Sequence, residues 1–462
     1  MVGVALLLNY VETMILPGLL NIQTYFGVTN SSLIAWVTSA FLIVGSAVSP
    51  LFGKLGDSYG KKRMFLIALS FYTVGVGLAG FSPSIYFLIG ARAIQGIGFA
   101  IVPLALAIIA ETFPRERIAT AQGAVSATFA IGAAAGLVIG AYIIQDFGWQ
   151  WAFHSAFILS LVLFAAIWKG LPSGHPGTGR RVDFSTVVLL MAGVSLILLY
   201  LTEGPYDGWY STYDLAYLIA GLALTVGFFV AESRRTNPLI QLSLLRIRNV
   251  LVANMVGIIS GSSMFMLFFA LIYYTELPSP VGLGLDPISA GLTIAPATVV
   301  MLVAGPGIGR LVTRSGPRPT LVLGALIAIA GFLLFVFNRG TATDLTVDSA
   351  VVLAGVVSII VPIVNMITVS LPYENVATGL GLNTMLRNIG GAIGPVLATT
   401  IMSTYAVTLQ VGPGVTKSFP TSSAFDYIFY LAAGILVVVI AFALVAKNYT
   451  FRNGQNGSGT SG

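Results

Sequence analysis

Long apolar stretches, separated by short polar loops, follow one another along the whole chain. A membrane-spanning helix needs about 20 consecutive, mostly apolar residues. Fourteen stretches meet that requirement, at residues 2–22, 33–53, 64–82, 86–110, 118–142, 151–169, 184–202, 215–232, 250–274, 288–309, 320–337, 349–371, 376–404 and 425–446. The pattern therefore predicts an all-α integral membrane protein with 14 transmembrane helices.

The basic residues lie almost entirely in alternate loops. With a cytoplasmic N-terminus, 18 of the 22 Lys and Arg residues face the cytoplasm, Arg339 and Lys417 face the outside, and Arg92 and Arg387 lie within spans. Cytoplasmic loops are enriched in Lys and Arg, so this asymmetry favours the orientation and an even number of helices. We expect a multi-pass protein of the cytoplasmic membrane with both termini inside, and no binding of nucleic acid.

The composition excludes several other classes of protein. Residues are 56% hydrophobic and only 8% charged, whereas an ordinary soluble domain has about 25% charged residues. The absence of cysteine excludes disulfides and cysteine metal sites, and the two histidines, His154 and His175, form no recognisable metal motif. Gly60-Lys61 is followed by Lys62 where a P-loop has Ser or Thr, and no nucleophile motif is present. We therefore expect neither an enzyme nor a cofactor.

Two segments of the chain match each other at a nearly constant offset. Residues 50–62, which include Pro50, Gly53 and Gly60, correspond to residues 306–318 at an offset of 256. Residues 123–138, from Gly123 to Val138, correspond to residues 381–396 at an offset of 258. The repeat predicts two pseudo-symmetric bundles of six helices with two inserted helices between them, an arrangement typical of transporters.

Three motifs resemble those of the major facilitator superfamily. Residues 53–62, with the spacing G-x-L-x-D-x-x-G-K-K, resemble its signature between helices 2 and 3. Residues 92–98 resemble its helix 4 motif, and residues 149–153 resemble its W-R-W-x-F motif before helix 6. With 14 helices, the chain resembles the drug:proton antiporter branch. It departs from the helix 5 antiporter motif, because Leu137 replaces the proline.

The domain boundaries follow from the repeat and the spans. We expect a first six-helix bundle at residues 1–170, two inserted transmembrane helices with cytoplasmic linkers at 171–249, and a second six-helix bundle at 250–447. The polar, Gly/Ser-rich segment 448–462 is expected to be a flexible cytoplasmic tail, and part of it could be a non-native extension.

Glu12 is the first candidate for proton coupling. Eleven residues precede it, about 16 Å of helix, which is roughly half the thickness of the hydrocarbon core. Ionisable residues at such depth are usually functional, so we predict that Glu12 carries a proton. Arg92 either modulates Glu12 as the halves move or is its permanent counter-ion, in which case Glu12 belongs to a structural ion pair.

Two further groups are assigned conformational roles. The resemblance implies that a latch at the cytoplasmic end braces the two halves, formed by Gly53, Asp57, Gly60, Lys61, Glu111 and Arg117. The alternative is a solvated loop that only directs membrane topology. Gly132, Gly136 and Gly140 recur every four residues and share one helix face. They form either a moving gate between the halves or a site of static close packing.

The substrate candidates are polar or aromatic residues within predicted spans. They are Tyr10, Trp36, Gln95, Asn254, Phe265, Asn365, Asn383 and Arg387. Aromatic side chains give an adaptable apolar surface, although most in a membrane helix face lipid or pack internally. Arg387 could bind an anionic group, so an anionic substrate stays an alternative.

The sequence as a whole predicts a secondary active transporter that works by alternating access. The favoured function is proton-coupled efflux of amphiphilic or cationic drug-like compounds, driven by the proton gradient without a cofactor. The alternative is a transporter of the same fold that moves a lipid or an anionic solute, and a non-transporting receptor or membrane enzyme comes third. We expect its partners to be a small amphiphilic molecule or lipid, protons and the bilayer, and we expect a monomer.

Overall fold

The computed structural model describes most of the chain. The described residues are 1–28, 31–113, 121, 125, 128–129, 131–171, 184–235, 238, 241–412 and 415–449. Arg117, Gly123 and His175, named above, and the tail beyond Tyr449 lie outside these ranges.

The first half contains long helices, three of which are interrupted. Its elements are α1 (Val2–Met14), η1 (Leu16–Gly18), α2 (Leu19–Tyr25), α3 (Ser31–Tyr59), α4 (Lys61–Gly80), α5 (Ile85–Gly96), η2 (Ile97–Ala100), α6 (Ile101–Thr112), η3 (Gly136–Gly140), α8 (Ala141–Phe147) and α9 (Trp149–Gly170). Pro17 lies in η1, where its missing N–H weakens the helix and a 3₁₀ turn joins α1 to α2. The first predicted span is therefore a broken helix.

The inserted pair and the second half follow. They comprise α10 (Ser185–Asp207), α11 (Thr212–Arg234), η4 (Leu242–Arg246), α12 (Arg248–Glu276), α13 (Pro287–Ser315), α14 (Pro317–Phe337), α15 (Ala342–Ser370), α16 (Tyr373–Thr404), β1 (Ala406–Gly412), β2 (Val415–Pro420) and α17 (Ser422–Val445). Within the described ranges, 12 helices are long and apolar enough to cross a membrane, and a shorter apolar helix covers Ile131–Phe147. With α16 these correspond to the predicted spans, except that the first part of the span predicted at 118–142 lies largely outside the described residues. The prediction of a helical membrane protein is confirmed.

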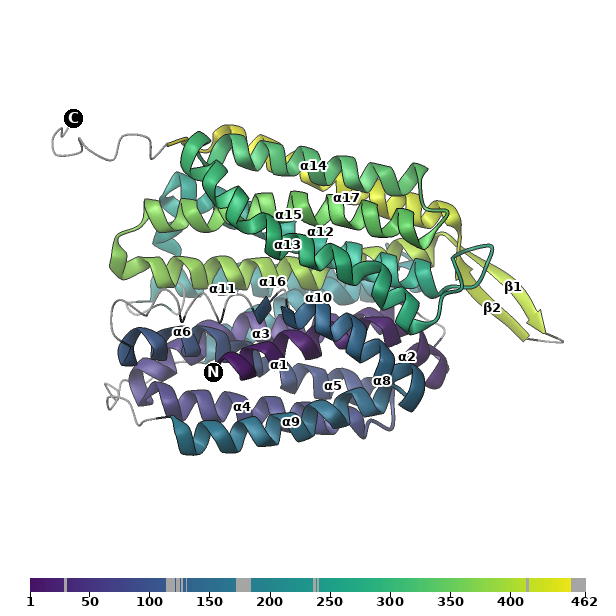
Figure 1. Ribbon diagram of the computed structural model, residues 1–462, viewed down its shortest axis with the longest axis horizontal. Helices are drawn as coiled ribbons and strands as arrows, with labels where there is room; N and C mark the ends of the chain where they lie inside the picture. The colour runs from purple at the N-terminus through teal and green to yellow at the C-terminus, as the bar shows by residue number, and fades with distance from the viewer. Residues whose placement is uncertain are drawn as a thin grey trace.

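The hairpin formed by β1 and β2 was not predicted. Its strands pair antiparallel from Ala406 opposite Pro420 to Gly412 opposite Val415. Figure 1 shows it projecting beyond the helix ends, on the side away from the C-terminus. The sequence contains a signal for it, because β-branched residues flank the Gly-Pro-Gly sequence at 412–414. Apolar stretches of about 20 residues do not reveal a short hairpin.

The internal repeat is visible in the helix boundaries. The bounds of α13 are those of α3 shifted by 256 residues, and α4 and α14 begin at the same offset. The glycines that join these helices, Gly60 and Gly316, have φ values of 96° and 89°. Only glycine adopts such a backbone without strain, so the same turn is built twice.

The two halves form separate layers. Figure 1 shows α12–α17 above α1–α9, with α10 and α11 behind them. Across the interface, α3 packs against α16, where the Ser39 hydroxyl donates to the Ala392 carbonyl at 2.8 Å. Gly291 of α13 lies against the Leu137 carbonyl of η3. We call the end that carries Lys54, Lys61 and Arg314 the basic end, and the opposite end the hairpin end.

Candidate functional site

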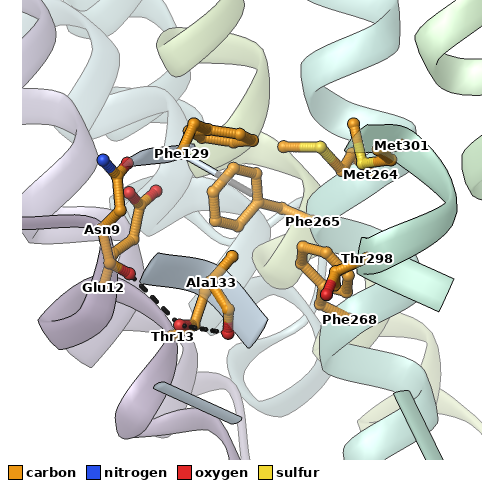
Figure 2. Close-up of a pocket in the computed structure, with 10 residues that line it drawn as sticks. All are labelled: Asn9, Glu12, Thr13, Phe129, Ala133, Met264, Phe265, Phe268, Thr298 and Met301. Atoms are coloured by element: carbon orange, nitrogen blue, oxygen red, sulfur yellow. Dashed lines mark hydrogen bonds between the residues drawn. The ribbon is translucent and has the colours of Figure 1, made fainter. Parts of the chain in front are cut away.

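A small cavity lies at the interface between the halves. Its lining comes from α1, from the helical residues around 129–133, from α12 and from α13: Asn9, Glu12, Thr13, Phe129, Ala133, Met264, Phe265, Phe268, Thr298 and Met301. Figure 2 shows Glu12 facing a wall of Phe and Met side chains across the cavity. Its volume of about 10 Å³ is close to the minimum that holds one water molecule. A drug-sized ligand does not fit in this conformation.

Glu12 brings a carboxylate to this apolar cavity. The residue is 6% exposed, and none of the ion pairs between described residues includes it. Arg92 and Arg387 both lie near enough to act on it electrostatically. A buried carboxylate without a direct partner is costly when ionised, so its protonation state is sensitive to the conformation around it. This geometry suits a group that exchanges a proton.

Arg92 is fully buried, and its guanidinium group is hydrogen-bonded to residues other than Glu12. Its Nε donates to the Val37 carbonyl of α3 at 2.9 Å, and its Nη1 donates to Gln95 Oε1 at 2.9 Å. The guanidinium carbon lies 4.2 Å from the centre of the Phe41 ring. These contacts tie α5 to α3, and they orient Arg92 without a direct ion pair to Glu12. Arg92 therefore acts on Glu12 through its charge and not through a direct ion pair.

Arg387 and Asn383 lie where α16 packs closely on α12. The Asn383 amide donates to the Ala253 carbonyl at 2.9 Å. Gly257 lies against the Asn383 side chain and Gly261 lies against the Arg387 backbone carbonyl, so the glycines of α12 let α16 approach closely. Arg387 reaches the electrostatic range of Glu12 from the second half. The single carboxylate of the cavity therefore faces one arginine from each half.

The glycine stripe faces α1, inside the first half. A Cβ atom on Gly132 would meet Asn9, and one on Gly136 or Gly140 would meet the backbone of Met14. Gly136–Gly140 forms a π-helical turn, a feature that is frequent at functional sites. Beside it, the Thr13 hydroxyl donates to the Ala133 carbonyl at 3.0 Å. The stripe thus fixes the helix that carries Glu12 against the irregular turn.

The predicted substrate residues are divided among several places. Among them, only Phe265 lines the cavity. Trp36 donates from Nε1 to Thr202 of α10 at 2.9 Å, Tyr10 lies near Ser155 of α9, and the Asn254 amide donates to the Val250 carbonyl at 2.7 Å.

Asn365 lies near the basic end and accepts a hydrogen bond from the Tyr449 hydroxyl at 2.9 Å. Burial raises the pKa of Tyr449 to about 12, so this phenol stays a donor near neutral pH. The bond fastens the segment after α17 across the basic end of α15. In this conformation Asn365 is thus engaged away from the cavity.

Most residues that line the cavity were missed from the sequence. Asn9 lies three residues before Glu12 on the same helix face, and Thr13 lies four residues after Asn9. Phe268 lies three residues after Phe265, and Met301 three after Thr298. Helical spacing from Glu12 and Phe265 could have identified Asn9, Thr13 and Phe268. No sequence signal indicated which face of α13 meets them.

The latch residues form a charged cluster within the first half. Lys61 Nζ lies 3.3 Å from Asp57 Oδ1 and also pairs with Glu111, so the cluster joins α3, α4 and α6. Gly60 supplies the turn between α3 and α4, while a Cβ on Gly53 would meet nothing within 4 Å. The role of this cluster in bracing the halves stays a prediction, and Arg117 lies outside the described residues.

Glu12 is one of several carboxylates that are buried within spans. Asp348, Glu232 and Asp214 are at most 1% exposed, and Glu276 is 8% exposed. Glu276 is covered because the following loop folds back, with Leu285 N donating to the Thr275 carbonyl. Position along a span therefore does not predict burial, since loops also cover helix ends.

Comparison with known proteins gives consistent results. A sequence model described as Major Facilitator Superfamily matches residues 1–395. The chain is 27% identical over 424 residues to the multidrug resistance protein Stp of Mycobacterium tuberculosis, covering 90% of this chain and 78% of that protein. It is 27% identical over 378 residues to the tetracenomycin C resistance and export protein of Streptomyces glaucescens, covering 80% and 69%.

Solved structures agree on the fold. A POT family transporter in complex with 5-aminolevulinic acid superposes with a TM-score of 0.68 at 14% identity, covering 96% of both chains. The xylose transporter XylE from E. coli, in a partially occluded inward-open conformation, gives 0.63 at 12% identity, covering 98% of this chain and 97% of that one.

Proposed function

We propose that this chain, which belongs to the Major Facilitator Superfamily, exports amphiphilic or cationic compounds in exchange for protons. The family and the curated relatives are transporters, so the chain is a multi-pass membrane transporter of small molecules and not an enzyme. The proposal also includes proton coupling, the direction of transport and a location in the cytoplasmic membrane. It further includes a basic end that faces the cytoplasm and a monomeric state.

The observation that carries the proposal is the position of Glu12. Its carboxylate faces an apolar cavity at the interface of the halves, opposite Phe265 and Met264. Aromatic and methionine side chains adapt to ligands of varied shape, and a carboxylate among them attracts a cation or a proton. Because both compete for one negative charge, binding of one favours release of the other.

The small volume of the cavity supports alternating access. With about 10 Å³ available, substrate binding requires the halves to separate on one side. Arg92 approaches Glu12 from the first half and Arg387 from the second, so separation changes the field at the carboxylate. We propose that this change couples the protonation of Glu12 to the conformation of the transporter.

The test compares wild-type protein and Glu12→Gln in liposomes with an acidic lumen and a clamped membrane potential. We expect the wild type to accumulate a permanently charged lipophilic cation, and Glu12→Gln to lose at least about tenfold of the initial gradient-driven rate, because Gln cannot exchange a proton. Binding of the cation, measured without a gradient, is expected to persist at reduced affinity. The measurement is the initial rate at which the cation accumulates in the lumen.

Glu276→Gln is the matched control. Glu276 is also a buried carboxylate of a spanning helix, but it lies 11 residues from Phe265 along α12, about 16 Å. It is expected to retain the gradient-driven rate. A wild-type rate that does not depend on the gradient, or a Glu12→Gln variant that keeps it, would contradict the proposal.

A second candidate function is transport of a lipid or an organic anion. It is favoured by the charges around the cavity, because two guanidinium groups act on a single carboxylate. When Glu12 is protonated, the site carries two positive charges. We expect this function to require Arg387: Arg387→Gln would lower uptake of an organic anion at least about tenfold. A wild-type protein that takes up the cation and not the organic anion would contradict this second function.

A further inference from the structure

A second, larger hollow lies at the basic end, outside the transport interface. Its volume is about 590 Å³, within the range of sites that hold drug-sized ligands. The lining is apolar except at Tyr59 and Arg63, and it comes from α3, α4, η2 and the start of α10, with Phe71, Phe184 and Val188 among its apolar residues. We call this hollow the α3–α10 groove.

The attachment of α10 explains why the groove exists. Three hydrogen bonds between α10 and the bundle helices lie toward the hairpin end: Trp36 donates to Thr202, Thr400 donates to the Leu201 carbonyl, and Tyr206 donates to Ser403. At the basic end, Ser185 and Thr186 of α10 are bonded to Arg235, which follows α11. The first turn of α10 is thus bonded to the segment after its partner helix, and space remains between this turn and α3.

The groove is open toward the bilayer. Among its lining residues, Phe71, Phe184 and Val188 are 45%, 54% and 62% exposed, and each lies on a span or at its first turn. An apolar hollow with such a rim takes hydrocarbon, and burial of each methylene contributes to binding. The occupant therefore has at least one long apolar chain.

Arg63 adds a positive charge at the mouth of the groove. It is exposed at the third residue of α4, and none of the hydrogen bonds or ion pairs between described residues involves it. Its neighbours are engaged: Lys61 pairs with Asp57 and Glu111, and Lys62 donates to the Leu171 carbonyl. A guanidinium at the level of the lipid headgroups forms bidentate bonds to a phosphate.

We propose that the α3–α10 groove binds an anionic phospholipid, with one acyl chain between α3 and α10 and the phosphate on Arg63. Basic pockets between transmembrane helices bind such headgroups, and the hydrocarbon chain fills space that protein side chains leave open. The lipid would add a contact between the inserted pair and the first half at the basic end, where Lys54 of α3 also donates to the Pro238 carbonyl. This site is separate from Glu12 and does not depend on the transported substrate.

The test is native mass spectrometry of the full-length protein, titrated in detergent with phosphatidylglycerol or phosphatidylcholine of identical acyl chains. Wild-type protein is expected to bind one phosphatidylglycerol about fivefold more tightly than phosphatidylcholine, and Arg63→Gln is expected to remove that preference. Arg314→Gln, which removes an exposed arginine at the end of α13, is the matched control and should keep it.

A second pair of variants tests the acyl chain. Val188→Trp places a large side chain in the groove and is expected to weaken binding of both lipids at least threefold, while Val230→Trp on the exposed face of α11 leaves it unchanged. Equal binding of both lipids to the wild type, or a preference that survives in Arg63→Gln, overturns the headgroup assignment. Undiminished lipid binding by Val188→Trp overturns the assignment of the acyl chain to the groove.

Discussion

Replacing Arg92 with alanine is expected to destabilise the purified transporter by about 3–5 kcal/mol, far more than loss of an exposed arginine. Arg92 is fully buried and large, so truncation leaves a cavity between α3, α4 and α5. Gln95 loses the donor to its Oε1, and Phe41 loses the cation above its ring. Glu12 also loses one of the two positive charges that act on it.

Thermal unfolding in detergent measures this effect. Arg310→Ala is the matched control, because Arg310 is an exposed arginine near the end of a spanning helix. Arg92→Lys is expected to fall between wild type and alanine, since lysine keeps the charge but cannot donate to Val37 and Gln95 in the same geometry. If Arg92→Ala unfolds at the same temperature as Arg310→Ala, Arg92 does not hold these helices together, and its role is confined to transport.

The helices were predictable because the bilayer imposes a length and a polarity on each span. The basic loops indicated an even number of spans. The repeat at an offset of 256 is reproduced by the bounds of α3 and α13. The hairpin at 406–420 was missed because it lies outside the membrane, where that constraint does not act. The break at Pro17 was missed because neighbouring helices re-satisfy backbone groups around such a turn.

The candidate site was only partly predictable. Glu12 stood out because a carboxylate within a span is rare, and Phe265 lies opposite it as a substrate residue should. Trp36 was indistinguishable from it in sequence, yet its indole binds Thr202 of the inserted pair. Which aromatic residue faces a cavity depends on how α12 and α13 are rotated against α1, and that rotation is set by packing between distant segments.

Replacing Gly136 with alanine is the second substitution with a large expected effect. The new Cβ would meet the Tyr10 carbonyl and lie 2.9 Å from the Met14 amide nitrogen, both backbone atoms that cannot turn aside. The helices must therefore separate, at a cost of about 1–3 kcal/mol. Separation also stretches the bond from Thr13 to the Ala133 carbonyl and displaces Glu12, so gradient-driven transport is expected to fall with stability.

Gly307→Ala in α13 is the matched control, because a Cβ there meets nothing within 4 Å, and alanine is the better helix former by about 1 kcal/mol. Transport per folded molecule then distinguishes the two roles of the stripe. If the stripe only packs α1 against η3, folded Gly136→Ala protein transports at nearly the wild-type rate. If the π turn changes shape during each cycle, the folded protein is slow, since an added methyl group obstructs the movement in every turnover. The position of Glu12, two residues from both Tyr10 and Met14, favours the second outcome.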